Sequence, residues 1–184
     1  VGAVSFINCY FGKLYTSNGE LVFDSVEWEF NFKKYLERNN INGLNAVSLL
    51  DGVTSIGEFC FSECNKLKTV SMPDSVTTIG NYGFVSNVSL KALTIPDTVT
   101  VLERDTFAYS KIDTVVFGNG ITEIPADCIA YSTTKTVVIS DSVKTIASSA
   151  FYGSDSLKTI IIGSGVEEIG SYVFSNPQYL SAVH

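Results

Sequence analysis

The sequence predicts a repeat solenoid made mainly of short β-strands, and two regularities carry this prediction. An apolar anchor recurs every 22 or 23 residues, at Phe61, Phe84, Phe107, Ile129, Phe151 and Phe174. Before each anchor lies a segment of alternating apolar and other residues, followed by turn-forming residues. A unit of this length cannot bury its own apolar face, so stacked neighbours must form a shared core.

Residue order within one copy predicts the elements of the coil. Leu90-x-x-Leu93-x-Ile95 alternates as a strand with one buried face. Pro96-Asp97 ends this strand, because proline has no N–H for a ladder and aspartate favours turns. Val99-x-x-Leu102 is a second, short extended piece on the opposite side of the coil. The long strands should centre near Val47, Val70, Leu93, Val115, Val137, Ile160 and Val183.

Apolar residues occupy the same places in successive copies and predict continuous buried columns. The short extended pieces contribute Val53, Val76, Val99, Ile121, Val143, Val166 and Ile56, Ile79, Leu102, Ile124, Ile146, Ile169. The copy around Ile129 departs most from the pattern, because Thr134 replaces a leucine and Pro125 follows Ile124. We expect the softest packing there.

Residues 1–45 do not follow the repeat, and residues 46–184 contain six copies of it. Asn18-Gly19 favours a hairpin over 13–23. Asp24 and Glu27 have capping-box spacing and favour a helix to about Arg38, although residues 26–32 also alternate as a strand would. In either form, this α+β segment should cap the first coil, as solenoids require.

The four cysteines do not predict a disulfide framework. Cys60 and Cys128 share the position before the anchor and lie three coils apart. At about 4.8 Å per coil their separation is roughly 14 Å, beyond the reach of a disulfide of about 7 Å between Cα atoms. We therefore expect Cys60, Cys64 and Cys128 to be small buried thiols.

Composition narrows the range of partners. The chain has 184 residues, a net charge of −7 and 45% hydrophobic residues. Phosphate binding needs a basic face that this sequence lacks, so nucleic acid is not the expected partner. There is no run of 18 apolar residues, so no membrane span is expected.

The copies share the motif L-x-x-I-x-I-P-x-S-V-x-x-I-G-x-x-A-F. It appears almost intact in Met72-Pro73-Asp74-Ser75-Val76-Thr77-Thr78-Ile79-Gly80 and again from Asp141 to Phe151. It resembles the BspA-like, Treponema-type class of leucine-rich repeat over about three quarters of the chain. The resemblance implies a curved leucine-rich-repeat solenoid, often on bacterial or protozoan surfaces, that binds host or neighbouring-cell proteins. It implies no shared catalytic residues.

The residues themselves predict no enzyme and no cofactor. The single histidine, His184, is the last residue, so a Ser/His or Cys/His nucleophile is not expected. Gly118-x-Gly120 and Gly163-x-Gly165 belong to the repeat rather than to a phosphate loop. Cys60-x-x-x-Cys64 lacks the second pair of ligands that zinc would need, and an aspartate column after the strands indicates turns more than calcium sites.

The outward side of the long strands is the candidate binding surface. Its residues change along the stack from Ala46 and Ser48 to more apolar ones. Val116, Val138 and Ile161 should form an exposed apolar strip about 10 Å long, and such strips mark interaction sites. The competing explanation is simple strand propensity. The full set of predicted contact residues is Val116, Val138, Ile161, Thr136, Thr159, Lys135 and Lys158.

Two settings suit such a protein. One is a secreted or surface-exposed recognition module of the adhesion or host-interaction type, as the resemblance implies. The other is an intracellular interaction or inhibitor protein with the same binding face, which unpaired cysteines favour. The chain begins at Val1 with no visible signal peptide, so it reads as a mature product or a fragment.

Overall fold

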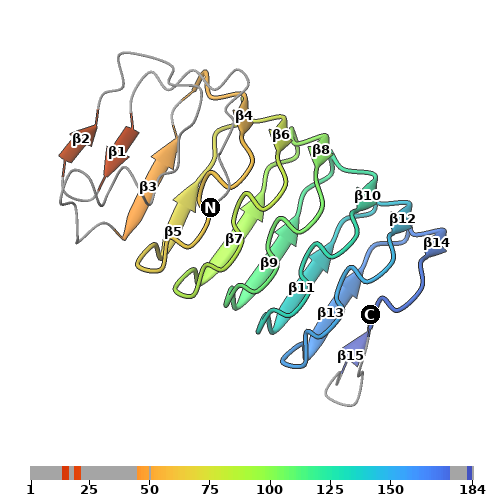
Figure 1. The fold of residues 1–184 in the computed structure, drawn as a ribbon. Coiled ribbons are helices and arrows are strands. Elements are labelled where there is room, and N and C mark those ends of the chain that lie inside the picture. The colour runs from red at the N-terminus through yellow and green to blue at the C-terminus, as the bar shows by residue number, and fades with distance from the viewer. Residues whose placement is uncertain (1–13, 17–18, 22–44, 50, 175–181, 184) are drawn as a thin grey trace.

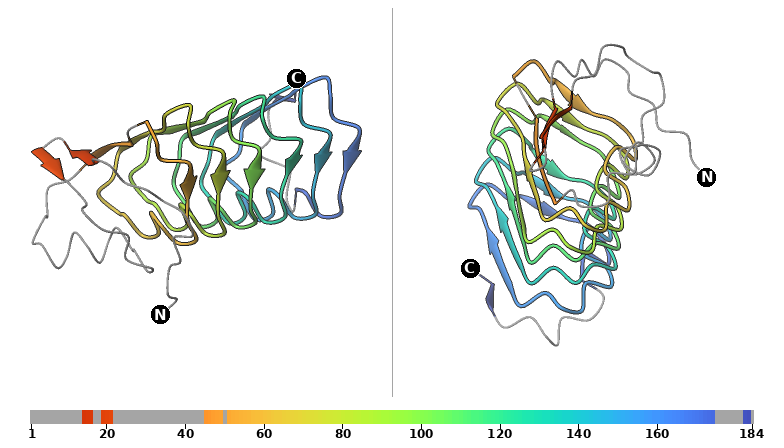
Figure 2. Two further views of the ribbon diagram at one scale, coloured as in Figure 1. Left: turned by 90° about the horizontal axis from the view of Figure 1, so that it is seen from above. Right: turned by 90° about the vertical axis from the view of Figure 1, so that its left-hand side faces the viewer.

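Figure 1 shows the computed structural model of the 184-residue chain, which describes residues 14–16, 19–21, 45–49, 51–174 and 182–183. All regular structure within these ranges is β-strand. Six coils follow one another along the stack, each with one long and one short strand. The two kinds of strand lie on different sides of the stack (Figure 2). The predicted fold class, a parallel-strand solenoid, is confirmed.

The long strands form the main wall. They are β3 (Ala46–Leu49), β5 (Thr69–Ser71), β7 (Ala92–Ile95), β9 (Thr114–Phe117), β11 (Thr136–Ile139), β13 (Thr159–Ile162) and β15 (Ala182–Val183). All seven predicted strand centres lie within these strands, and the pairs that they form with one another are parallel. The ladder is interrupted between β5 and β7, so the wall consists of two sheets.

The short strands confirm the second extended piece of each copy. They are β4 (Ser55–Ile56), β6 (Thr78–Ile79), β8 (Val101–Leu102), β10 (Glu123–Ile124), β12 (Thr145–Ile146) and β14 (Glu168–Ile169). They pair in parallel as β4-β6-β8 and β10-β12-β14. We number the coils 1 to 6, so that coil 1 begins with β3 and coil 6 with β13.

The anchors stack through the centre of the solenoid. Phe61, Phe84, Phe107 and Phe151 are buried, and Ile129 is buried at the anchor position of coil 4. The ring centroids of Phe61 and Phe84 are 5.2 Å apart, and those of Phe84 and Phe107 are 5.7 Å apart. Aromatic stacking at this spacing adds to the burial of the rings. The predicted anchor column is therefore the spine of the core.

Between each short strand and the next long strand, the chain forms an irregular wall that carries the anchor. Backbone hydrogen bonds join this wall from coil to coil: the Phe61 N–H donates to the Gly83 carbonyl at 2.8 Å, and the Phe107 N–H donates to the Cys128 carbonyl at 2.8 Å. Hydroxyl groups join the coils on the side of the Pro-Asp turns, where Thr98 Oγ1 donates to the Val76 carbonyl at 2.9 Å. Polar groups at the turns are thereby satisfied by the neighbouring coil.

Several apolar positions of the repeat are less buried than predicted: Val70, Met72, Leu102, Ile162, Val166 and the anchor Phe174 are half-buried. Val70 lies in β5 and Met72 follows its last residue, next to the interruption of the long-strand ladder. Ile169 is 54% exposed. It lies in β14, which among the described residues pairs with β12 alone.

The first strands pair with the solenoid. β1 (Leu14–Thr16) and β2 (Gly19–Leu21) are antiparallel, which confirms the predicted hairpin. Gly19 is the first residue of β2 and pairs with Thr16, so it belongs to the strand rather than to the turn. β1 also pairs antiparallel with β3 and covers the edge of the first long strand. The predicted helix from Asp24 to Arg38 lies outside the described residues.

The described cysteines confirm the prediction of buried thiols. Cys60, Cys64 and Cys128 are each at most 4% exposed. Burial, and to a smaller degree the nearby Asp105 carboxylate, raises the pKa of the Cys128 thiol far above its ordinary value. Because the thiolate is the nucleophile, this thiol is unreactive at neutral pH.

Alkylation rates test this expectation. We expect Cys60, Cys64 and Cys128 to react slowly with iodoacetamide in the folded protein and at the rate of a free thiol after denaturation. Mass spectrometry after timed quenching identifies each site. Labelling of all three within the dead time under native conditions would contradict their burial.

Candidate functional site: the outward face of the long strands

The register of the long strands places the predicted apolar strip as expected. Val116 pairs with Val138, and Val138 pairs with Ile161, so the three side chains occupy adjacent rungs on one face. The same ladder aligns Thr114, Thr136 and Thr159 beside them. Inward neighbours such as Val137 and Ile160 are fully buried, which fixes the opposite face outward.

The strip is less exposed than predicted. Ile161 is 40% exposed, whereas Val116 and Val138 are half-buried. Val116 and Val138 each have register partners on both neighbouring strands, whereas the described register pairs Ile161 with Val138 alone, so the valines are flanked by more side chains. The apolar surface therefore consists of one exposed isoleucine and two partly accessible valines.

Charges border the strip at the start of the strands. Lys135 and Lys158 are exposed and adjacent, because the Lys158 N–H donates to the Lys135 carbonyl at 2.9 Å. The Lys135 ammonium group donates to Asp113 at 2.6 Å, and the Lys91 ammonium group lies 3.7 Å from the same carboxylate. The hydrogen bond from Lys135 lowers the pKa of Asp113. Asp113 occupies the position that Lys91 and Lys135 hold in the neighbouring coils, and it forms ion pairs with both.

The aspartates after the strands act as turn residues, as the sequence indicated. Asp97 Oδ1 accepts the Asn119 N–H at 2.7 Å, and Asp141 Oδ1 accepts the Ser164 N–H at 2.7 Å. The hydrogen bond from the Ser164 N–H, with a smaller contribution from the Ser164 hydroxyl, lowers the pKa of Asp141. Each carboxylate thereby stabilises the turn of the next coil through a hydrogen bond. Among the described residues, no group of three or more Asp, Glu, Cys or His is arranged to hold a metal ion.

A hollow opens on the side of the short strands, where β8 and β10 do not pair. In the other junctions, the residue after the short strand donates its N–H to the preceding coil, as Ala147 does to the Ile124 carbonyl at 2.9 Å. Pro125 occupies this position in coil 4 and has no N–H to donate. The hollow of about 450 Å³ is lined by Leu102, Glu103, Arg104, Glu123 and Pro125, among others.

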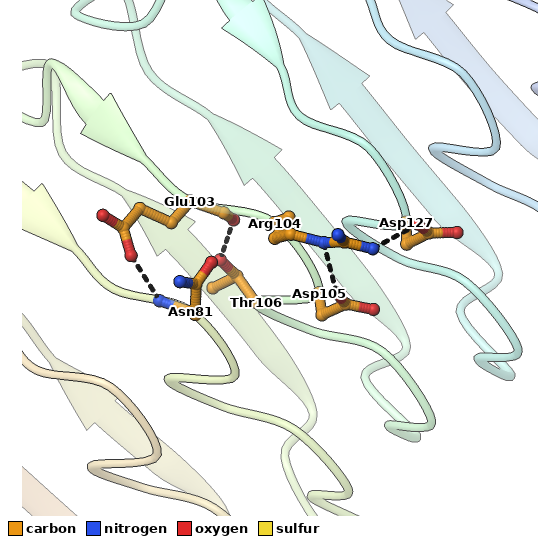
Figure 3. Close-up of polar contacts among 6 residues, drawn as sticks. All are labelled: Asn81, Glu103, Arg104, Asp105, Thr106 and Asp127. Carbon is orange, nitrogen blue, oxygen red and sulfur yellow. Dashed lines mark hydrogen bonds and ion pairs between the residues drawn. The ribbon is translucent and has the colours of Figure 1, made fainter. Parts of the chain in front are cut away.

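Polar contacts cluster beside this hollow (Figure 3). Arg104 Nε donates to Asp105 at 2.9 Å, and an Arg104 Nη donates to Asp127 at 3.2 Å. Glu103 accepts the Asn81 N–H at 2.8 Å. The Asp105 carboxylate raises the pKa of the neighbouring Tyr82 hydroxyl. The cluster links coils 2, 3 and 4 at a junction where the strand ladder is missing, so we assign it a structural role.

Sequence reasoning missed a group of exposed tyrosines on the irregular wall. Tyr109 and Tyr131 are 57% and 50% exposed, and their rings stack with centroids 5.2 Å apart. Both stand two residues after an anchor, at Phe107 and Ile129. The shared spacing was visible in the sequence, but the other copies carry Glu63, Ser86, Gly153 and Asn176 at this position.

A family comparison agrees with the geometry. The family described as BspA type leucine rich repeat region matches residues 38–155 and 122–184, with six copies. The chain belongs to this family. BspA-type repeats form solenoids that typically bind proteins and serve as non-catalytic scaffolds. A search of curated proteins finds no significant match.

A solved structure of a bacterial leucine-rich repeat protein shares this fold. A leucine-rich repeat protein from Eubacterium ventriosum is 29% identical, with a TM-score of 0.63 over 71% of this chain and 34% of that one. A leucine rich cell surface protein from Faecalibacterium prausnitzii is 24% identical, with a TM-score of 0.39 over 76% of this chain and 53% of that one. The chain thus spans about a third of the Eubacterium protein. No helix among the described residues is long and apolar enough to cross a membrane.

Proposed function

We propose that this BspA-type repeat protein is a non-catalytic recognition module that binds a protein partner on the outward face of β9, β11 and β13. The observation that carries the proposal is the alignment of Val116, Val138 and Ile161 on adjacent rungs of one ladder. Apolar residues aligned on an open face and bordered by charge suit protein recognition. Thr136 and Thr159 would contact the partner beside the strip, and Lys135 and Lys158 would attract an acidic one.

The extent of the recognition unit is part of the proposal. We assign residues 46–184 to the repeat unit and residues 1–45 to an N-terminal cap. The pairing of β1 with β3 supports the cap, because it covers a strand edge that would otherwise be open. In a protein as long as the Eubacterium relative, this chain would supply one segment of a larger binding surface.

The proposed setting is the cell surface or the extracellular space, with a role in adhesion or host interaction. Membership of the BspA-type family supports it. The buried thiols of Cys60, Cys64 and Cys128 favour the second setting, an intracellular interaction protein, because oxidising compartments usually pair cysteines. The same strand face would bind the partner in both settings.

Paired substitutions on the same face test the proposed site. Val138→Asp combined with Ile161→Asp places two charges on the strip. Ser48→Asp combined with Ser71→Asp is the matched control, because these serines also pair in register and are exposed, at the other end of the wall. Circular dichroism confirms that both variants are folded.

The measurement is the affinity for a partner captured by the parent chain, determined by surface plasmon resonance. We expect the Val138/Ile161 variant to bind at least about tenfold more weakly, a loss of about 1.4 kcal/mol, and the serine variant to bind like the parent. If the folded Val138/Ile161 variant keeps parental affinity, the partner binds elsewhere on the chain.

A further inference from the structure

The turn Gly118-Asn119-Gly120 of coil 4 places an exposed asparagine directly before a glycine. Asparagine is a thermolabile residue, because its side-chain amide can be lost by deamidation. The reaction begins when the backbone nitrogen of the following residue attacks the asparagine Cγ atom. A side chain on that following residue hinders the attack, and glycine has none. Asn119 is exposed and Gly120 is half-buried, so solvent reaches the dipeptide.

The packing of the coils requires the glycine of this dipeptide. A Cβ at Gly120 would overlap the carbonyl oxygens of Asp97 and Val99 in coil 3. The equivalent residue of coil 6, Gly165, meets the Asp141 carbonyl oxygen of coil 5 in the same way. The close contact between coils therefore keeps a residue without a side chain next to Asn119.

The backbone of this turn is less constrained than that of the equivalent turns. In coils 2, 3, 5 and 6 the fourth residue of the turn donates its N–H to the carbonyl of the first, as Val76 to Pro73, Val99 to Pro96, Val143 to Ser140 and Val166 to Gly163. In coil 4 the corresponding Ile121 N–H donates to no acceptor among the described residues. The Gly118 carbonyl accepts the Ser140 hydroxyl at 2.9 Å instead. An open turn of this kind lets Asn119 and Gly120 rotate toward the geometry of attack with fewer hydrogen bonds to break.

The amide group that must leave is weakly held. The Asn119 N–H donates to Asp97 Oδ1 at 2.7 Å, but Asn119 Nδ2 reaches the same oxygen only at 3.3 Å, which is long for a hydrogen bond. Asn87 shows the opposite case. It is fully buried, and its Nδ2 donates to the Phe61 and Phe84 carbonyls at 2.7 and 2.8 Å. The Asn87 amide is therefore protected, whereas the Asn119 amide is not.

The turn can form without asparagine. Coil 6 carries Ser164 at the equivalent position, between Gly163 and Gly165. The Ser164 N–H and hydroxyl donate to Asp141 Oδ1 at 2.7 and 3.0 Å, so serine makes both contacts that Asn119 makes with Asp97. Serine has no amide to lose. Asn119→Ser is therefore a variant that keeps the contacts and removes the reactive group.

We propose that Asn119 is a site of spontaneous deamidation through Gly120. The Gly120 nitrogen bonds to Asn119 Cγ and gives up its proton to solvent, and the side-chain nitrogen leaves as ammonia. Water then opens the resulting succinimide ring at one of its two carbonyl groups. Opening at one carbonyl gives aspartate at position 119, and opening at the other gives isoaspartate.

Isoaspartate would loosen the contact between coils 3 and 4, because it inserts Cβ into the backbone. The turn has no room for this atom on the side of coil 3. A Cβ at Gly118 would lie 2.5 Å from the Ile95 carbonyl oxygen and 2.7 Å from Asp97 Oδ1. The turn must move outward and lose its hydrogen bonds to Asp97. The same two coils already lack one strand pairing, that of β8 with β10.

Peptide mapping of the incubated full chain tests the reaction. The protein is kept folded in mildly alkaline buffer, and samples are digested and analysed by mass spectrometry with electron-transfer dissociation, which distinguishes isoaspartate from aspartate. The internal control is Asn65, which is also exposed but precedes Lys66. We expect deamidation at Asn119 to be at least about tenfold faster than at Asn65, and Asn87 to stay intact. Conversion of Asn119 no faster than that of Asn65 would overturn the proposal.

Thermal denaturation tests the structural consequence. The parent and the Asn119→Ser variant are compared before and after the same incubation. The other Asn-Gly pairs, Asn18-Gly19 and Asn42-Gly43, are present in both proteins, so a difference between the two reports on position 119. We expect the incubated parent to melt at a lower temperature and the incubated variant to change less. Equal losses in both proteins would show that modification of Asn119 does not loosen the coils, and the mapping of the parent remains decisive if the variant does not fold.

Discussion

Phe107→Ala is expected to lower the free energy of unfolding by about 3–5 kcal/mol, the usual effect of removing a large buried ring. Phe107 is fully buried, stacks on Phe84 and meets the Phe117 ring edge-on at 6.3 Å. It also lies in coil 3, next to the junction where β8 and β10 do not pair. Because coils contact only their neighbours, loss of this ring should weaken the coupling between the two halves of the stack.

Phe151→Ala is the matched control. Phe151 is equally buried, but its coil pairs with both neighbours through the long and the short strands. Urea denaturation followed by circular dichroism should show a similar loss of stability for both variants and a broader transition only for Phe107→Ala. A sharp transition for Phe107→Ala, with an unchanged m-value, would show that the halves remain coupled without the ring.

Much of the fold could be predicted because the same pattern of residues recurs in each copy of the repeat. A local physical cause explains each element of the coil: the alternation around Leu93, the turn at Pro96-Asp97 and the anchor at Phe107. The repetition of these elements then predicts that the coils stack on one another. Ile129 shows the strength of the periodicity, because it was assigned to the anchor column by spacing alone and is fully buried.

Features that depend on how one coil sits on the next could not be predicted in the same way. Pro125 marks in the sequence the junction where β8 and β10 do not pair. No residue type marks the junction where β5 and β7 do not pair, since the pattern around Val70 and Met72 matches that of other copies. The tyrosine pair also escaped prediction, because its outward direction follows from positive φ values that residue types do not reveal.

For the candidate strand face, the alignment of the side chains could be predicted better than their exposure to solvent. The two-residue period fixes which side of β9, β11 and β13 faces outward, and equal repeat spacing fixes which residues become neighbours. The accessibility of Val116 and Val138 depends instead on the size of the side chains on adjacent strands. Sequence alone therefore gave the position of the strip but overstated its exposed area.

Gly120→Ala should be strongly destabilising, although it adds only one methyl group. A Cβ at this position would lie 2.3 Å from the carbonyl oxygens of both Asp97 and Val99 in the preceding coil. Both contacts are with backbone, so coils 3 and 4 would have to move apart. Overpacking of this kind costs about 1–3 kcal/mol, and we expect a loss of stability near the upper end of that range.

Thr98→Ala is the control, because Thr98 occupies the same position in coil 3 and its Cβ is already accommodated. It loses the γ-methyl group and the hydrogen bond from Thr98 Oγ1 to the Val76 carbonyl, the latter worth about 1 kcal/mol, and creates no overlap with the neighbouring coil. Thermal and urea denaturation of both variants compares the two effects. The glycines of Gly118-x-Gly120 would then be explained by close contact between coils. If Gly120→Ala proves no more destabilising than Thr98→Ala, the turn has room for a side chain, and contact between coils does not account for the glycine.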